Sequence, residues 1–83
     1  MDINKISSAV IKAAINVHKE LGPGLLESVC QSCMDIELNE MGLKVEVEVP
    51  IPIIFRGREI TKQGFRIDLL VENTLIVELK STD

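Results

Sequence analysis

Apolar and polar residues in the amino-terminal part of the chain follow the period of an α-helix. Apolar side chains recur at spacings of three and four, namely at Ile3, Ile6, Val10, Ala13 and Val17. Lysines occupy other rows of the helical wheel, so the pattern predicts an amphipathic helix with one apolar face. We place this helix at residues 3–21, because Gly22, Pro23 and Gly24 then end it.

A second helix is predicted for residues 25–41. Gly42 follows it as a left-handed cap, and Leu43 is available for the apolar contact that accompanies such a cap. Apolar positions are so numerous here that we expect the helix to be covered on more than one side. Glu27 shares a helical row with apolar residues and is predicted to point along their stripe. The structural alternative is a first-turn glutamate that the helix dipole stabilises.

Beyond the second helix the period changes to two, which is the pattern of a β-strand with one wet face. In residues 44–49, three charged side chains alternate with three valines. Pro50 and Pro52 then end this strand or confine it to the edge of a sheet. Another short strand is expected at residues 53–55, with a turn at residues 56–59.

The last segment predicts a β-hairpin with strands at residues 65–71 and 75–80. If its turn centres on Asn73, three pairs of residues face each other on one side of the sheet: Leu70 with Ile76, Asp68 with Glu78, and Arg66 with Lys80. The expected fold is therefore α/β in α+β order, with two N-terminal helices followed by a short, mainly antiparallel sheet.

Length and composition favour one domain that spans residues 1–83, because the chain is long enough for a single hydrophobic core. Phe55 and Phe65 are the only aromatic residues, and we expect both in the core, which leaves no aromatic platform for stacking bases. No secretion signal is visible, and no stretch approaches the roughly 20 apolar residues of a membrane helix. The cytoplasm is the expected location, without membrane contact.

The net charge of −4 opposes broad electrostatic capture of nucleic acid. The basic residues are nevertheless clustered. One group lies on a single helical row, at Lys5, Lys12 and Lys19, and another falls within one short stretch, at Arg56, Arg58, Lys62 and Arg66. Taken alone, each cluster is most simply a solvated face.

Cys30 and Cys33 have the CxxC spacing of redox and zinc sites. A zinc site would need a second pair of ligands, and the only histidine, His18, lies on the preceding helix. A redox motif would need its first cysteine at a helix amino terminus, where the thiolate is stabilised. These cysteines lie inside a predicted helix among apolar residues, so two reduced core thiols are favoured.

The pair Asp68 and Glu78 carries the candidate chemistry, because two carboxylates opposite each other repel and destabilise a sheet. Diagonal ion pairs with Arg66 and Lys80 on an exposed face are one compensation. The other is a shared Mg²⁺ ion, which takes oxygen ligands and is commonly held by one or two carboxylates. Apolar neighbours on both strands predict that the charges are mostly buried, which favours the metal. Lys80 would then orient water or steady a developing negative charge.

The arrangement of Asp68, Glu78 and Lys80 on two adjoining strands, preceded by a helix, resembles the PD-(D/E)XK nuclease superfamily. Ile67 stands where that motif has a loosely kept proline. A longer match lies upstream, where residues 22–30 read GPGLLESVC and resemble the signature of the small GxxExxY family within that superfamily. Residues 16–21 and 42–45 are also similar to that family, so the resemblance spans nearly the whole chain.

This resemblance implies a restriction-endonuclease-like core in which Glu27, Asp68 and Glu78 would ligate Mg²⁺ and Lys80 would assist attack of water on a phosphodiester. Cys30 stands where the family has tyrosine, so the contact of that hydroxyl is absent. The family continues with a further helix and strand, so the chain is expected to be truncated after Asp83. An uncovered sheet edge and face then favour pairing with a second copy, and we expect a homodimer.

Two functions follow from this reasoning. The first is Mg²⁺-dependent hydrolysis of phosphodiester bonds in nucleic acid, with catalytic Asp68, Glu78 and Lys80. The alternative is a non-catalytic dimerisation or binding module that keeps the nuclease-like fold and holds its carboxylates in ion pairs. A third possibility, a thiol redox protein, would require an exposed Cys30 or Cys33 with a low pKa.

Overall fold

The first helix, α1 (Ile3–Leu21), has the predicted bounds in the computed structural model, which describes residues 2–60 and 65–80. The side chain of Asp2 caps it by accepting a hydrogen bond from the backbone N–H of Asn4 at 3.1 Å. The helix ends at Gly22, whose φ of +81° favours glycine. Its buried residues lie on the predicted apolar face and contact the core.

The second helix, α2 (Glu27–Glu40), begins two residues later than predicted. It ends at Glu40, one residue before the predicted end, and its cap is as expected, because the N–H of Gly42 donates to the carbonyl of Asn39 and that of Leu43 to the carbonyl of Leu38. These two bonds form a Schellman motif, which buries Leu43 beside Leu38. The expected cover on more than one side is wrong, since Ile36 is 60% exposed. One face of α2 packs on the core, and the other faces solvent.

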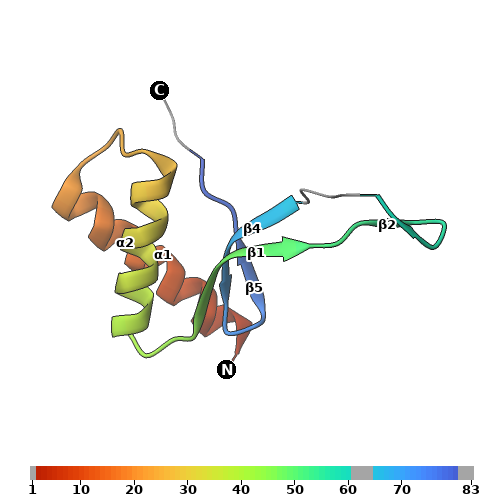
Figure 1. The fold of residues 1–83 in the computed structure, drawn as a ribbon. Coiled ribbons are helices and arrows are strands. Elements are labelled where there is room, and N and C mark those ends of the chain that lie inside the picture. Colours follow the sequence, from red (N-terminus) through yellow and green to blue (C-terminus); the bar gives the residue numbers. More distant parts are fainter. Residues whose placement is uncertain (1, 61–64, 81–83) are drawn as a thin grey trace.

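Three antiparallel strands form the main sheet in the order β1-β4-β5. Their bounds are β1 (Val45–Ile51), β4 (Phe65–Val71) and β5 (Leu75–Val77). Pro50 lies within β1 and does not end it, because β1 is an edge strand. Two helices followed by this short antiparallel sheet confirm the predicted fold class (Figure 1).

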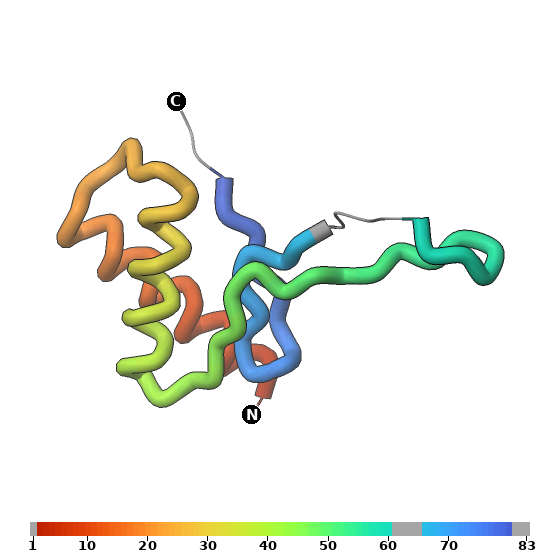
Figure 2. The backbone as a smooth tube through the Cα atoms, viewed as in Figure 1, coloured from red at the N-terminus to blue at the C-terminus, as the bar shows by residue number. Residues whose placement is uncertain are grey.

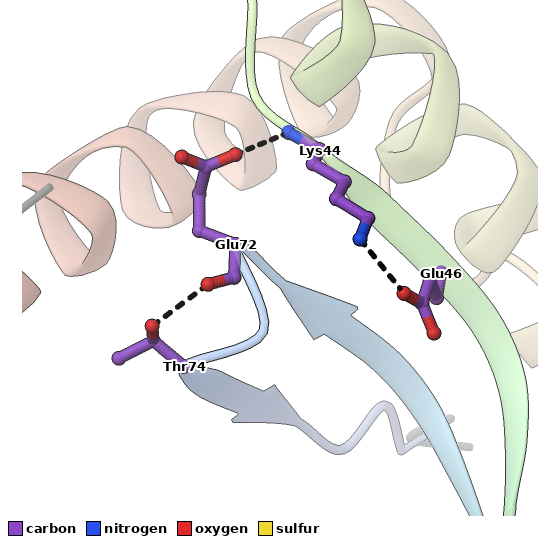
Figure 3. A network of polar contacts seen from close by, with 4 residues as sticks. All are labelled: Lys44, Glu46, Glu72 and Thr74. Atoms are coloured by element: carbon purple, nitrogen blue, oxygen red, sulfur yellow. Dashed lines mark hydrogen bonds and ion pairs between the residues drawn. The ribbon is translucent and has the colours of Figure 1, made fainter.

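The hairpin between β4 and β5 has the predicted pair of Leu70 opposite Ile76, but β5 ends at Val77 and not at residue 80, so the expected pairs of Asp68 with Glu78 and Arg66 with Lys80 are not part of the strand register. Its turn contains Glu72 and Asn73, both with φ near +50°, as a type I′ turn requires. Glu72 also ties this turn to the start of β1, because its carboxylate accepts from the backbone N–H of Lys44 at 2.6 Å (Figure 3). The N–H of Glu72 donates to the carbonyl of Lys44 at 2.8 Å, which completes the link.

The core lies between the sheet and the two helices (Figure 1). Alternate strand residues contribute to it, and those that are fully or partly buried against the helices are Val45, Leu69, Val71, Leu75, Val77 and Leu79. The residues between them point to the other face of the sheet, where Ile76 is exposed. None of the described helices is long and apolar enough to cross a membrane.

Two further strands, β2 (Ile54–Phe55) and β3 (Arg58–Glu59), form a separate hairpin that extends away from the core (Figure 2). The sequence predicted a turn over all of residues 56–59, but the turn is confined to Arg56 and Gly57. The expectation that Phe55 joins the core is wrong, because 57% of its surface is exposed at the end of this hairpin. The side chain of Phe65 lies outside the described part of the structure.

Candidate functional site

Asp68 lies in the central strand β4 and is held through both its side chain and its backbone. Its carboxylate oxygen Oδ2 accepts a hydrogen bond from the backbone N–H of Leu79 at 2.8 Å. Its carbonyl oxygen accepts from Nε2 of Gln31, on α2, at 2.9 Å. The residue is half-buried, so both bonds are partly shielded from water. Asp68 is therefore a well-positioned carboxylate that joins the end of the hairpin to the second helix.

An interruption in the pairing of β1 with β4 accounts for the bond from Gln31. The Cα pairs run to Val47 opposite Leu69 and resume at Val49 opposite Ile67. Between them Glu48 has φ +50°, a left-handed conformation that takes its peptide groups out of the regular ladder. The Asp68 carbonyl consequently takes its donor from a side chain of α2.

Glu27, the first residue of α2, lies at the same pocket as Asp68. This pocket of about 530 Å³ is lined by Leu26, Glu27, Ser28, Gln31, Glu48 and Asp68. The helix dipole stabilises the Glu27 carboxylate in the first turn, as the structural alternative held. Glu27 is exposed, and it also lines a mainly apolar pocket together with Cys30 and Met34 of its predicted helical row. The fold thus brings together two of the predicted site residues that are far apart in the sequence.

Glu78 and Lys80 follow the last paired residue of β5, Val77, and both are exposed. The expectation that the charged cluster is mostly buried is therefore wrong for these two. Apolar neighbours such as Ile67 and Leu69 are buried in β4, whereas Glu78 and Lys80 lie beyond the last strand pair and are exposed. Lys80 shares with Glu27 the lining of a second, mainly apolar pocket of about 300 Å³ between the helices and the end of the hairpin.

The ion pairs expected on this face are also different from those observed. In the ion-pair alternative Arg66 pairs diagonally with Glu78, but its guanidinium lies 3.9 Å from the carboxylate of Glu48. Both side chains are mostly exposed, so this contact stabilises the fold little. The contact places a positive charge beside Glu48, which lines the Asp68 pocket.

The donor atoms at the Asp68 pocket suit a hard cation, because carboxylate and amide oxygens are the ligands that Mg²⁺ and Ca²⁺ take. Three carboxylates line the pocket, those of Glu27, Glu48 and Asp68, and proteins commonly hold Mg²⁺ with one or two carboxylates together with water. Among residues 2–60 and 65–80, no group of three or more histidine, cysteine or acidic side chains is arranged to hold a metal ion. Of the predicted ligands, Glu27 and Asp68 line this pocket, and Glu78 is not part of its lining.

The cysteines do not have the properties of a redox site. Cys30 and Cys33 are free thiols, both half-buried against the core. Burial, and then the neighbouring Cys33, raises the pKa of the Cys30 thiol. A reactive redox cysteine needs the opposite shift, toward the thiolate. The structure therefore agrees with the sequence in favouring two thiols that pack against the core.

Gln31 and Glu48 are the site residues that the sequence reasoning missed. Gln31 lies one helical turn after Glu27, so the spacing of the two polar residues on one face was an available signal. Glu48 gave no such signal, because it looks like an ordinary member of an alternating strand.

Comparison with known proteins gives one family. The family model of the PD-(D/E)XK nuclease superfamily matches residues 4–83. No curated protein and no solved structure matches the chain.

Proposed function

Because the chain belongs to the PD-(D/E)XK nuclease superfamily, we propose that it hydrolyses phosphodiester bonds of nucleic acid with the help of Mg²⁺. The observation that carries this proposal is the common pocket of Glu27 and Asp68, which joins two carboxylates of the predicted site. They come from α2 and β4, so formation of the pocket requires the tertiary fold and not a local motif.

The proposed ligands of Mg²⁺ are Glu27, Asp68 and Glu78. Two of them line the pocket, and Glu78 immediately precedes Leu79, whose N–H holds the Asp68 carboxylate. When bound, Mg²⁺ supplies Lewis-acid polarisation of the phosphate group. The hydrogen bond from Leu79 leaves the second carboxylate oxygen of Asp68, Oδ1, to serve as a ligand. It also fixes the orientation of the group, which limits the entropy lost on binding.

Lys80 is proposed to stabilise negative charge that develops on the phosphate during hydrolysis. It is close enough to Glu27 for both to line one pocket. Glu27 thus lines both the pocket of Lys80 and the pocket of Asp68.

Within the superfamily we propose membership of the GxxExxY group. The support is the run from Gly22 to Cys30, whose glutamate, Glu27, lies at the Asp68 pocket. The position of the signature tyrosine is Cys30, a half-buried residue that lines the apolar pocket beside Lys80. A thiol at this position supplies packing in place of a strong hydroxyl donor.

A Mg²⁺ titration followed by backbone NMR tests the metal site. We expect the amides of Glu27, Asp68 and Glu78 to shift together and to saturate. The variant Asp68→Asn keeps an oxygen acceptor for Leu79 but removes the charge, so the shifts should disappear while the fold remains. Glu40→Gln is the matched control, because Glu40 is an exposed carboxylate at the far end of α2.

Cleavage of a labelled oligonucleotide in the presence of Mg²⁺ tests the activity itself. Lys80→Ala should preserve the Mg²⁺ shifts and remove cleavage. If wild-type protein shows neither shifts nor cleavage, the proposed function is refuted and the non-catalytic module remains. Cleavage that Asp68→Asn does not change would remove Asp68 from the site.

We also propose a homodimer, located in the cytoplasm. Exposed apolar residues support association, among them Ile11 and Ile15 on α1 and Ile76 on β5. The outer side of the short edge strand β5 also has no neighbour among the described strands, so it is open to pairing. Sedimentation equilibrium over a range of concentrations measures the mass, and a monomer throughout would refute this part.

A further inference from the structure

The hairpin of residues 54–60, here called the arm, is built differently from the rest of the molecule. It continues from β1 and extends away from the core as a narrow two-stranded ribbon (Figure 2). Its strands pair Ile54 with Glu59 and Phe55 with Arg58. The N–H of Ile60 donates to the carbonyl of Ile53 at 3.0 Å, which closes the base of the arm. The described residues give it backbone hydrogen bonds but no hydrophobic core of its own.

The tip of the arm exposes an aromatic ring and two guanidinium groups. Ile54 is 67% exposed and Phe55 57% exposed, so burial in the core does not account for either side chain. The guanidinium carbon of Arg56 lies 4.9 Å from the centroid of the Phe55 ring, which is a cation–π contact. Arg58 is exposed directly opposite Phe55 on the neighbouring strand. The tip therefore combines a stacking surface with positive charge.

The backbone of the turn supports a role for the Arg56 side chain. Arg56 and Gly57 are the central residues of a two-residue loop, with φ of +50° and +77°, the combination of a type I′ turn. Asparagine or glycine suits the first of these positions better than arginine, which is strained there. A residue that opposes the local backbone preference is expected where its side chain has a function.

Charge is strongly segregated between this part of the chain and the remainder. Four of the nine basic residues but only one of the 13 acidic residues fall within residues 54–66. Three of these basic residues, Arg56, Arg58 and Arg66, belong to the described structure and are exposed. Within the arm, Arg56 and Arg58 outnumber Glu59, so this part of an acidic protein attracts a polyanion locally, while the acidic remainder repels it.

We propose that the arm binds a single-stranded segment of nucleic acid. In this arrangement a base stacks on the Phe55 ring, and Arg56 and Arg58 contact the adjoining phosphates. Aromatic rings with flanking arginines recognise unpaired bases in this way, and the stacking does not depend on base identity. The proposal rests on the proposed function, because β1 connects the arm to the strand pair that contains Asp68 and the bound strand would be the substrate of that site.

Fluorescence anisotropy with a labelled oligothymidylate of about 20 nucleotides tests binding, in EDTA so that no cleavage occurs. Phe55→Leu keeps an apolar side chain but removes the ring, and it should raise Kd about tenfold. Arg56→Asn suits the type I′ turn, so the arm should still form, while Kd rises several-fold. For Arg56→Asn, the magnitude of the slope of log K against log salt concentration should fall by about one, because one phosphate contact is lost. Lys12→Gln, an exposed lysine on α1, is the control and should change Kd less than twofold.

Four outcomes would overturn the proposal. They are no binding by wild-type protein, equal binding by the arm variants, tighter binding to the corresponding duplex than to the single strand, and loss of self-association in Phe55→Leu with binding unchanged. The last result would make the arm an interface between copies of the chain. Arm-dependent binding without Mg²⁺ shifts or cleavage would support the role of the arm and refute the proposed nuclease activity. Cleavage with an unchanged KM in Arg56→Asn would support the nuclease activity and refute the role of the arm.

Discussion

Replacement of Asp68 separates its structural contribution from its proposed role as a ligand. In Asp68→Ala the N–H of Leu79 loses its acceptor, a carboxylate oxygen at 2.8 Å. A hydrogen bond to a charged group contributes about 1.5–3 kcal/mol when buried. Since Asp68 is half-buried and water can partly replace it, we expect the free energy of unfolding to fall by about 1–2 kcal/mol. Asp68→Asn retains an oxygen acceptor, so its loss should be about 0.5 kcal/mol.

Urea denaturation followed by circular dichroism measures both changes. For a domain of this size, 1 kcal/mol corresponds to a shift in Tm of about 4–8 °C, so thermal unfolding gives an independent value. Glu78→Gln should change stability by less than about 0.5 kcal/mol, because Glu78 is exposed. Equal urea midpoints for Asp68→Ala and wild type would refute the structural role of the Leu79 bond. They would favour the simple repulsion between Asp68 and Glu78 that the sequence suggested.

Two further predictions concern the core and the thiols. Leu69→Ala, at a fully buried position of the central strand, should cost about 2–5 kcal/mol in urea denaturation, whereas Ile76→Ala on the exposed face should cost less than about 1 kcal/mol. The pKa of the Cys30 thiol is raised in the folded state. The stabilisation from this thiol is therefore present below the ordinary cysteine pKa of about 8.5, and it is lost as the pH rises through the raised pKa. Unfolding measured from pH 7 to 10 should show this loss, and Cys30→Ala should abolish it. Alkylation of native Cys30 at pH 7 should be slow, and rapid reaction would revive the redox hypothesis.

The parts of the fold that the sequence predicted correctly are those governed by local signals. The bounds of α1 follow from its apolar period and from Gly22, and the cap of α2 follows from Gly42 and Leu43. The register of the last hairpin follows from its centre at Asn73. In each case the residues that determine the conformation are neighbours in the chain, so a pattern in the sequence was sufficient.

The candidate site was less predictable because it depends on contacts between distant residues. The cluster of Asp68, Glu78 and Lys80 was expected to be mostly buried, since every second neighbour is apolar. Only the tertiary structure decides how much of each strand is covered, and here Asp68 is half-buried beside α2 whereas Glu78 and Lys80 lie beyond the last strand pair and are exposed. The conformation of Glu48, and with it the bond from Gln31 to Asp68, arises from tertiary structure that no local pattern indicates. The same reason explains Phe55, which a composition argument assigns to the core.

The strand order has a consequence for the synthesis of the protein. β1 ends at Ile51, but the strand that pairs with it, β4, is complete only at Val71. At a ribosomal rate of about 5–20 residues per second, β1 emerges about one to four seconds before its partner. During that interval the nascent strand exposes unpaired backbone groups, while the helices are already complete. The charges of Glu46 and Glu48 and the proline at position 50 oppose pairing of this strand with other chains. They therefore protect β1 before β4 is made, and they protect it afterwards as an edge strand of the finished sheet.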